Sequence, residues 1–133
     1  MIVVDTNIIS YLFITGEFSE RAEEILLKDS EWSAPLLWRS EFRSVLSQYI
    51  RKGLLTLEDS IEIMENASAL MENNEFDVVS KQVLELVKTS DLSAYDCEFV
   101  ALAKDLGIKL ITADNIIVTQ FPDHAIAIKT FLR

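Results

Sequence analysis

Four acidic residues stand out because of where they fall in the expected secondary structure. Asp5 and Asp114 each follow a short apolar run that is typical of a buried strand. Open α/β sheets bind their ligands beyond the carboxyl ends of such strands. Glu41 and Asp96 lie on helix faces that otherwise carry apolar side chains, where a carboxylate is costly unless something pairs with it. This pattern suggests that the four acids share one site.

Carboxylates that share a pocket repel one another, by about 4 kcal/mol per pair at 4 Å with an effective dielectric constant near 20. Such a cluster persists if cations occupy it or if some of the carboxylates take up protons. Oxygen ligands favour Mg²⁺ or Mn²⁺, and the chain has only one cysteine and one histidine, Cys97 and His124, to offer to zinc. Metal ions held by carboxylates can activate water and stabilise the leaving oxygen of a phosphodiester. The sequence has no glycine-rich phosphate loop, which argues against a nucleotide-driven enzyme.

Each acid also has an ordinary explanation. Asp5 is a suitable cap for the helix that follows it. Glu41 could be a rim glutamate that reaches water or a distant lysine, since Arg39 and Arg43 point away from it by helical spacing. Ser93 and Asp96 have the spacing of a capping box.

Composition limits the classes of protein that are possible. The 133 residues suit one domain, 1–133, with a single core. No apolar run approaches the roughly 18 residues of a membrane span, so we expect a soluble, cytoplasmic protein. The net charge of −10 argues against a protein that coats nucleic acid through a basic surface. It does not exclude an enzyme whose acidic site binds a divalent metal.

The order of the predicted elements indicates an α/β fold. We expect strands at residues 2–4, 32–34, 76–79, 108–111 and 125–128. We expect helices at residues 6–14, 18–28, from 35 to about 52, from 56 to about 72, from 80 to about 88, 96–106 and 115–121. Pro35 fits a helix entrance, Ser80 a helix cap, and Gly107 the left-handed residue that commonly closes a helix. Strands and helices alternate, which predicts a three-layer α/β domain with a mostly parallel sheet.

Four motifs carry a resemblance to a known family. They are VVDTN at residues 3–7, WRSEF at 38–42, YDCEFVALAK at 95–104 and LITAD at 110–114. With these motifs in this order and spacing, the chain resembles PIN-domain ribonucleases over essentially its whole length. It is most similar to the VapC-like toxins of type II toxin–antitoxin pairs.

The resemblance implies a three-layer α/β/α PIN-like fold with a central, mostly parallel sheet. It implies a Mg²⁺- or Mn²⁺-dependent endoribonuclease that cleaves RNA, forms a homodimer and is blocked by a cognate antitoxin. The acids that match the catalytic and metal-binding positions of the family are Asp5, Glu41, Asp96 and Asp114. Asn7 and Thr112 match polar positions that often support the metal site.

The sequence departs from the family after Asp114, where many relatives carry an arginine or a lysine and this chain has none. Other bases must then hold the RNA. The candidates are Arg39, Arg43, Arg51 and Lys52. The alternative is that these four are solvated helix charges.

Two other functions remain open. The chain could be a catalytically weak or inactive PIN-like module that acts through protein or RNA binding. It could also be a receiver-like phosphoacceptor, although such proteins usually need paired acids after the first strand and only Asp5 follows it here. If the site is an acidic groove, we expect an inhibitor to enter it with a basic segment that places an arginine on the carboxylates.

Overall fold

A computed structural model describes residues 1–133. Five parallel strands form one sheet in the order β3-β2-β1-β4-β5. The strands are β1 (Ile2–Val4), β2 (Trp32–Pro35), β3 (Glu75–Phe76), β4 (Leu110–Thr112) and β5 (Ala125–Ala127). The prediction of a mostly parallel sheet within an α/β fold is therefore confirmed.

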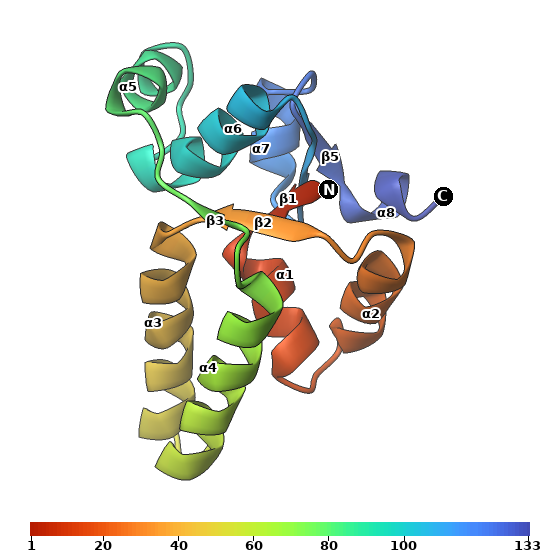
Figure 1. The fold of residues 1–133 in the computed structure, drawn as a ribbon, viewed down its shortest axis with the longest axis vertical. Helices are drawn as coiled ribbons and strands as arrows, with labels where there is room; N and C mark the ends of the chain where they lie inside the picture. The colour runs from red at the N-terminus through yellow and green to blue at the C-terminus, as the bar shows by residue number, and fades with distance from the viewer.

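Eight helices surround this sheet. They are α1 (Thr6–Phe13), α2 (Ser19–Lys28), α3 (Leu37–Arg51), α4 (Leu57–Met71), α5 (Ser80–Lys88), α6 (Ala94–Leu106), α7 (Asn115–Gln120) and α8 (Ile128–Phe131). Helices α1, α2, α3 and α4 lie on one side of the sheet, and α5, α6 and α7 lie on the other (Figure 1). Because both faces are covered, β1, β2 and β4 are buried along their whole length.

Local sequence signals set several helix ends. The Thr56 hydroxyl caps α4 by accepting the Asp59 N–H, and Ser93 caps α6 in the same way through the Asp96 N–H. Gly107 ends α6 with a φ of +67°, in the left-handed region that glycine enters without steric cost. The predictions for Ser93 and Gly107 are confirmed.

Several predicted boundaries are wrong. Pro35 is the last residue of β2 rather than a helix entrance, since it pairs with Phe76 of β3. The strand predicted at 76–79 consists of Glu75–Phe76, because β2 ends at Pro35 and leaves the next residues without a partner. Val79, not Ser80, is the cap of α5, and no side chain caps that helix.

The C-terminal region contains one element that the sequence pattern did not predict. The expected strand at 125–128 is β5, and it ends at Ala127. Helix α8 follows directly from Ile128 and lies beside α2, where the Lys28 ammonium lies 4.8 Å from the centre of the Phe131 ring. None of the helices is both long and apolar enough to cross a membrane.

Candidate functional site

The four predicted acids line one small hollow. Val4 pairs with Ile111 in neighbouring parallel strands, so β1 and β4 end at the same edge of the sheet. Asp5 follows β1 directly and Asp114 lies two residues beyond β4. Glu41 on α3 and Asp96 in the first turn of α6 complete the set, and the hollow has a volume of about 80 Å³. Its other lining residues are Thr6, Asn7, Phe99 and Ile117.

Asp5 and Asp114 are connected through Thr112. Asp5 is buried, and its Oδ1 accepts the Ile8 N–H at 3.3 Å, which caps α1. The buried Thr112 hydroxyl donates to Asp5 Oδ2 and accepts the Asp114 N–H at 3.0 Å. The Asp114 carboxylate in turn accepts the Ile116 N–H at 2.9 Å as the cap of α7. Thr112 therefore fixes the two strand-end acids relative to each other, while Asn7 is an exposed lining residue.

Thr6 holds Glu41 in place. Its hydroxyl donates to Glu41 Oε1 at 2.7 Å, which joins the start of α1 to α3. The sequence pattern did not predict this contact. The residues are 35 positions apart, and the only signal for the contact was that Thr6 directly follows Asp5.

The ordinary explanation for Asp96 accounts for its backbone only. The Asp96 N–H donates to Ser93 Oγ at 3.1 Å and so completes the cap of α6. Its carboxylate lines the acidic hollow. Cap and site roles are thus divided between the main chain and the side chain of one residue.

Three carboxylates of this hollow, those of Asp5, Glu41 and Asp96, have raised pKa values. Burial raises the pKa of Asp5 from its ordinary 3.8 to about 6, against the lowering effect of the Thr112 hydrogen bond. Burial also raises the pKa of Glu41, and the charge of Asp96 adds to this effect. The pKa of Asp96 is raised by burial and then by the charge of Asp114. No lysine or arginine lines the hollow to offset these charges.

The donor set fits a hard divalent cation, because all its charged groups are carboxylates. A volume of about 80 Å³ accommodates an ion with a few waters, at roughly 10–15 Å³ of such volume per water. As the side chains stand, no three acidic, histidine or cysteine residues are arranged around a single ion position. The acids Asp5, Glu41 and Asp114 each accept a hydrogen bond from the protein instead.

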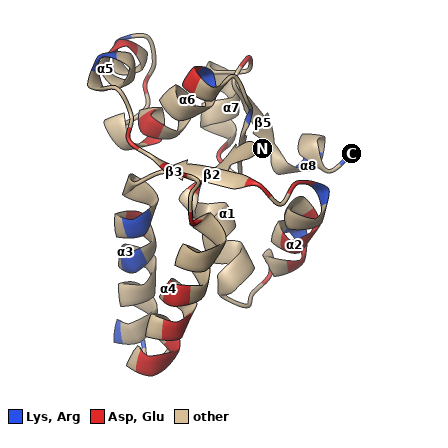
Figure 2. Cartoon of the chain, in the orientation of Figure 1, with Lys and Arg blue, Asp and Glu red and all other residues tan.

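The predicted RNA-binding bases are not gathered at this hollow. Arg39 forms a two-pronged ion pair with Glu75, with both N–O distances 2.5 Å. Arg43, Arg51 and Lys52 are exposed, the first within α3 and the other two at its end. Figure 2 shows basic residues at several points along this helix. Because α3 rises about 1.5 Å per residue, Arg51 is about 15 Å further along the helix than Glu41.

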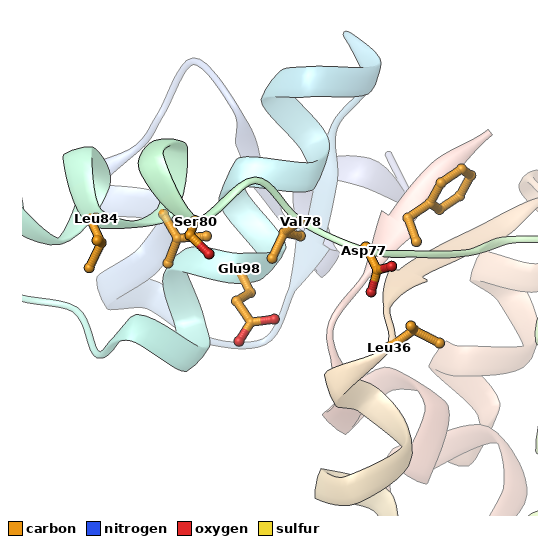
Figure 3. Close-up of a pocket in the computed structure, with 8 residues that line it drawn as sticks. Leu36, Asp77, Val78, Ser80, Leu84 and Glu98 are labelled. Atoms are coloured by element: carbon orange, nitrogen blue, oxygen red, sulfur yellow. The ribbon is translucent and has the colours of Figure 1, made fainter.

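A larger, more apolar hollow of about 380 Å³ adjoins the start of α3. The Glu98 side chain extends from α6 into the space between α5 and Leu36 (Figure 3). Burial raises the pKa of Glu98, and the charge of Glu41 raises it further. Glu98 is thus a fifth acid near the site, and the only sequence signal for it was its position two residues after Asp96.

A parallel α/β sheet with an acidic hollow at the carboxyl ends of its central strands defines a class of candidate hydrolases. The PIN domain family matches residues 2–120, and the chain belongs to that family. Ribonuclease VapC3 of Pyrobaculum aerophilum is 28% identical over 124 residues, which cover 91% of this chain and 95% of that protein.

Solved structures share the fold at low sequence identity. PAE2754 from Pyrobaculum aerophilum superposes with a TM-score of 0.77 at 17% identity, over 98% of this chain and 92% of that one. FitAcB from Neisseria gonorrhoeae gives 0.75 at 18% identity, over 97% and 99%. A toxin–antitoxin complex from Klebsiella pneumoniae gives 0.71 at 17% identity, over 96% and 98%. The predicted PIN-like fold is therefore confirmed.

Proposed function

We propose that this protein is a metal-dependent endoribonuclease that hydrolyses RNA phosphodiester bonds, and that it is the toxin of a toxin–antitoxin pair. The observation that carries the proposal is the hollow lined by Asp5, Glu41, Asp96 and Asp114 within a PIN-domain fold. The similarity to a protein named Ribonuclease VapC3 supports RNA as the substrate. We place this activity in the cytoplasm, where RNA and a cognate antitoxin would both be present.

The four acids would hold Mg²⁺ or Mn²⁺, with Thr112 and Asn7 as supporting polar residues. When bound, such an ion supplies a polarised water and positive charge for the leaving oxygen. Thr112 and the Ile8 N–H hold both oxygens of Asp5, which limits its rotation. Thr6 orients Glu41, so that one of its oxygens faces the α1 terminus and the other is free for a ligand or a water.

The test is cleavage of a labelled single-stranded RNA by purified Asp5→Asn and Asp96→Asn variants with Mn²⁺. We expect each to lose at least about 100-fold in rate, because even groups that only orient metal ligands are worth roughly 10–100-fold. Circular dichroism and urea unfolding establish that the variants are folded. Undiminished cleavage by a folded Asp5→Asn variant would falsify the catalytic role of this acid.

A catalytically weak module that acts through binding is the second candidate. Two observations favour it: no three acids surround a single ion position, and no base lines the hollow. Calorimetric titration with Mn²⁺ separates the two candidates. An inactive module binds no Mn²⁺, whereas the nuclease binds it and loses that binding in Asp5→Asn.

The proposed partner is an antitoxin that inserts a basic segment into the acidic hollow. Structures with the same fold include one described as FitAB bound to a DNA fragment and one described as a toxin–antitoxin complex. An arginine on the carboxylates would form charge-assisted hydrogen bonds and occupy the position of the metal. A partner that co-purifies at low but not high salt is expected, and a neutral or acidic contact segment in that partner would contradict the proposal.

The proposed homodimer would use the apolar hollow of Figure 3. Two exposed apolar side chains line it, namely Leu36 and Leu84, at 42% and 63% exposure. A second copy that covers these residues removes apolar surface from water, which favours association. This placement brings the dimer contact beside Glu98 and the start of α3.

A further inference from the structure

A third hollow, lined in part by Thr112, lies beside the acidic site. It has a volume of about 340 Å³, within the range of roughly 300–1,000 Å³ that is typical of small-molecule sites. Its lining combines aromatic rings, bases and small polar groups. The residues are Tyr11, Phe18, Arg21, Thr112, Ala113, Asn115, Ala127, Ile128 and Lys129.

Residues from distant parts of the sequence meet in this hollow because α8 packs beside α2. The Lys28 ammonium donates to the Phe131 carbonyl and lies 4.8 Å from its ring centre, which connects the two helices. That contact brings Lys129 near Arg21, although 108 positions separate them in the sequence. Neither the helix α8 nor this pairing was visible in the sequence pattern.

The aromatic part of the hollow is a pair of rings at its rim. Tyr11 of α1 and Phe18, which precedes α2, have ring centres 4.9 Å apart and planes inclined by 38°. Phe18 is 44% exposed, so part of it remains accessible to a ligand. Aromatic rings at such a rim are suitable for stacking with a planar base.

The charged part of the hollow is cationic. Arg21 and Lys129 are exposed, neither forms an ion pair, and no acid lines this hollow. The acids near these two bases, Glu17, Glu20 and Glu24, lie in a separate depression on their other side. A phosphate in the hollow would therefore meet two bases without a carboxylate between them.

Residues of this hollow adjoin residues of the acidic site. Thr112 lines it while its hydroxyl donates to Asp5. Asn115 lines it and directly follows Asp114. The charge of Asp5 also reaches Tyr11, whose pKa is raised by burial and then by that charge. A chain lying across the acids can thus place its next unit in this hollow.

We propose that this hollow binds the nucleotide next to the cleaved phosphodiester of single-stranded RNA, with its base against Tyr11 and Phe18 and its phosphate held by Arg21 and Lys129. The inference rests on the proposed ribonuclease function and names the substrate contact of that site. An acidic peptide could satisfy the two bases, but it has no planar group for the ring pair and no reason to lie next to a metal site. The combination of rings, bases and adjoining carboxylates favours RNA.

The first experiment measures binding of a fluorescent single-stranded RNA of about ten nucleotides. The protein is the full chain carrying Asp96→Asn, so that the RNA stays intact. Asp96 does not line the hollow that contains Thr112, so this change leaves the proposed subsite unaltered. We expect Arg21→Ala/Lys129→Ala to weaken binding about tenfold and to lower the slope of log K against log salt by about 0.7, since the two bases hold one phosphate and each phosphate neutralised on a single strand contributes roughly 0.7. The matched control is Lys88→Ala/Lys104→Ala, which removes the same charge from exposed positions on α5 and α6 outside both hollows and should leave binding near the parent value.

The second experiment tests the rings with Phe18→Ala, which we expect to weaken RNA binding about fivefold or more. Leu27→Ala is the control, because it removes an 87% exposed apolar side chain from α2 outside the hollow. In cleavage assays on the otherwise unmodified protein, Arg21→Ala/Lys129→Ala should raise KM while kcat changes little.

The outcomes separate the subsite from the function on which it rests. If the unmodified protein cleaves RNA and Arg21→Ala/Lys129→Ala cleaves with the same KM, the subsite proposal is wrong and the ribonuclease proposal stands. If the unmodified protein neither binds nor cleaves RNA, both are wrong. Retained RNA affinity in the double variant with lost affinity for an oligoglutamate peptide would identify a peptide site and overturn the proposal.

Discussion

Asp5 combines structural and site roles in one buried carboxylate. One oxygen caps α1 through the Ile8 N–H, and the other accepts the Thr112 hydroxyl. Burial nevertheless dominates and raises its pKa to about 6. In the metal-free protein, an ionised Asp5 is therefore less favourable in the folded than in the unfolded state.

This difference predicts how stability depends on pH. Because the folded-state pKa of about 6 lies above the ordinary 3.8, the protonated carboxyl stabilises the fold below about pH 4, and this contribution is lost as the pH rises through about 6. Two pKa units correspond to about 3 kcal/mol of unfolding free energy. In EDTA, urea unfolding at several pH values should show a steeper loss of stability from about pH 4 to 7 in the unmodified protein than in Asp5→Asn.

The substitution keeps the local hydrogen bonds, since the amide can accept from Ile8 and donate to Thr112. Asp5→Asn should accordingly be more stable than the unmodified protein at neutral pH without metal. Parallel stability curves for the two proteins across this pH range would contradict the role assigned to burial.

Thr112 predicts a second effect, on metal affinity. Thr112→Val removes the hydroxyl that connects Asp5 to the Asp114 N–H, and it leaves that N–H without its partner at a cost of about 1–3 kcal/mol. We expect Mn²⁺ affinity, measured by calorimetry, to fall about 10–100-fold, as for other groups that orient ligands. Thr112→Ser retains the hydroxyl and should recover most of the affinity. An affinity equally reduced in both variants would indicate a packing effect instead.

Residue types and positions predicted which acids meet, but not how they are held. Asp5 and Asp114 follow apolar runs, so strand ends place them, and Glu41 and Asp96 interrupt apolar helix faces. The bond between Thr6 and Glu41 and the position of Glu98 depend on how α1, α3 and α6 pack. A helix pattern specifies a face, but it does not specify which polar atom of another element that face will meet.

The start of α3 is anchored to the edge strand β3 by Glu75. The carboxylate accepts the Trp38 indole N–H at 2.8 Å and forms the ion pair with Arg39. Since Trp38 is fully buried, loss of that acceptor leaves its indole N–H without a hydrogen-bond partner. This arrangement also explains why Arg39 is a poor candidate for RNA, because its guanidinium already has an anionic partner.

The matched pair Glu75→Ala and Glu75→Gln separates the two contacts. Glu75→Ala should lower the unfolding free energy by about 1–3 kcal/mol, because the Trp38 N–H loses its partner. Glu75→Gln retains a carbonyl acceptor for Trp38 and should cost less, since the remaining loss is a partly exposed ion pair. Urea unfolding measures both. Equal destabilisation would show that the Arg39 pair, not the indole bond, carries the anchor.

For helices and strands, the sequence predicted their order along the chain better than the residues at which they begin and end. Apolar periodicity and capping residues located most helices, because both are local signals. The length of β3 is set by its partner β2, and the turn from β5 into α8 is set by packing on α2. Those limits come from contacts between segments far apart in the chain, which a local pattern does not contain.

Association of two copies is a property of the whole molecule, and Leu84 provides its test. Leu84→Glu places a charge at the apolar hollow of Figure 3 without disturbing the core, because Leu84 is 63% exposed. We expect the proposed homodimer to dissociate at concentrations where the unmodified protein remains dimeric, as measured by size exclusion with light scattering. Leu27→Glu on α2 is the control and should remain dimeric. If Leu84→Glu stays dimeric, the contact between the two copies lies at another surface.

Under the proposed function the acidic hollow binds a divalent metal, so we expect the stability of the whole fold to depend on that metal. A cation bound only to the folded state stabilises it by RT ln(1 + [L]/Kd), about 2.7 kcal/mol at 100 times Kd. The metal needs ionised carboxylates, so protons compete with it for Asp5 below about pH 6. The stabilisation gained from Mn²⁺ should therefore grow as the pH rises through about 6, over the same range in which the metal-free protein becomes less stable.

Thermal unfolding with Mn²⁺ and with EDTA, at matched ionic strength, measures the difference. Asp5→Asn should show little of it at any pH, and a gain from Mn²⁺ that is independent of pH and unchanged in this variant would indicate general screening of surface charge rather than binding in the hollow.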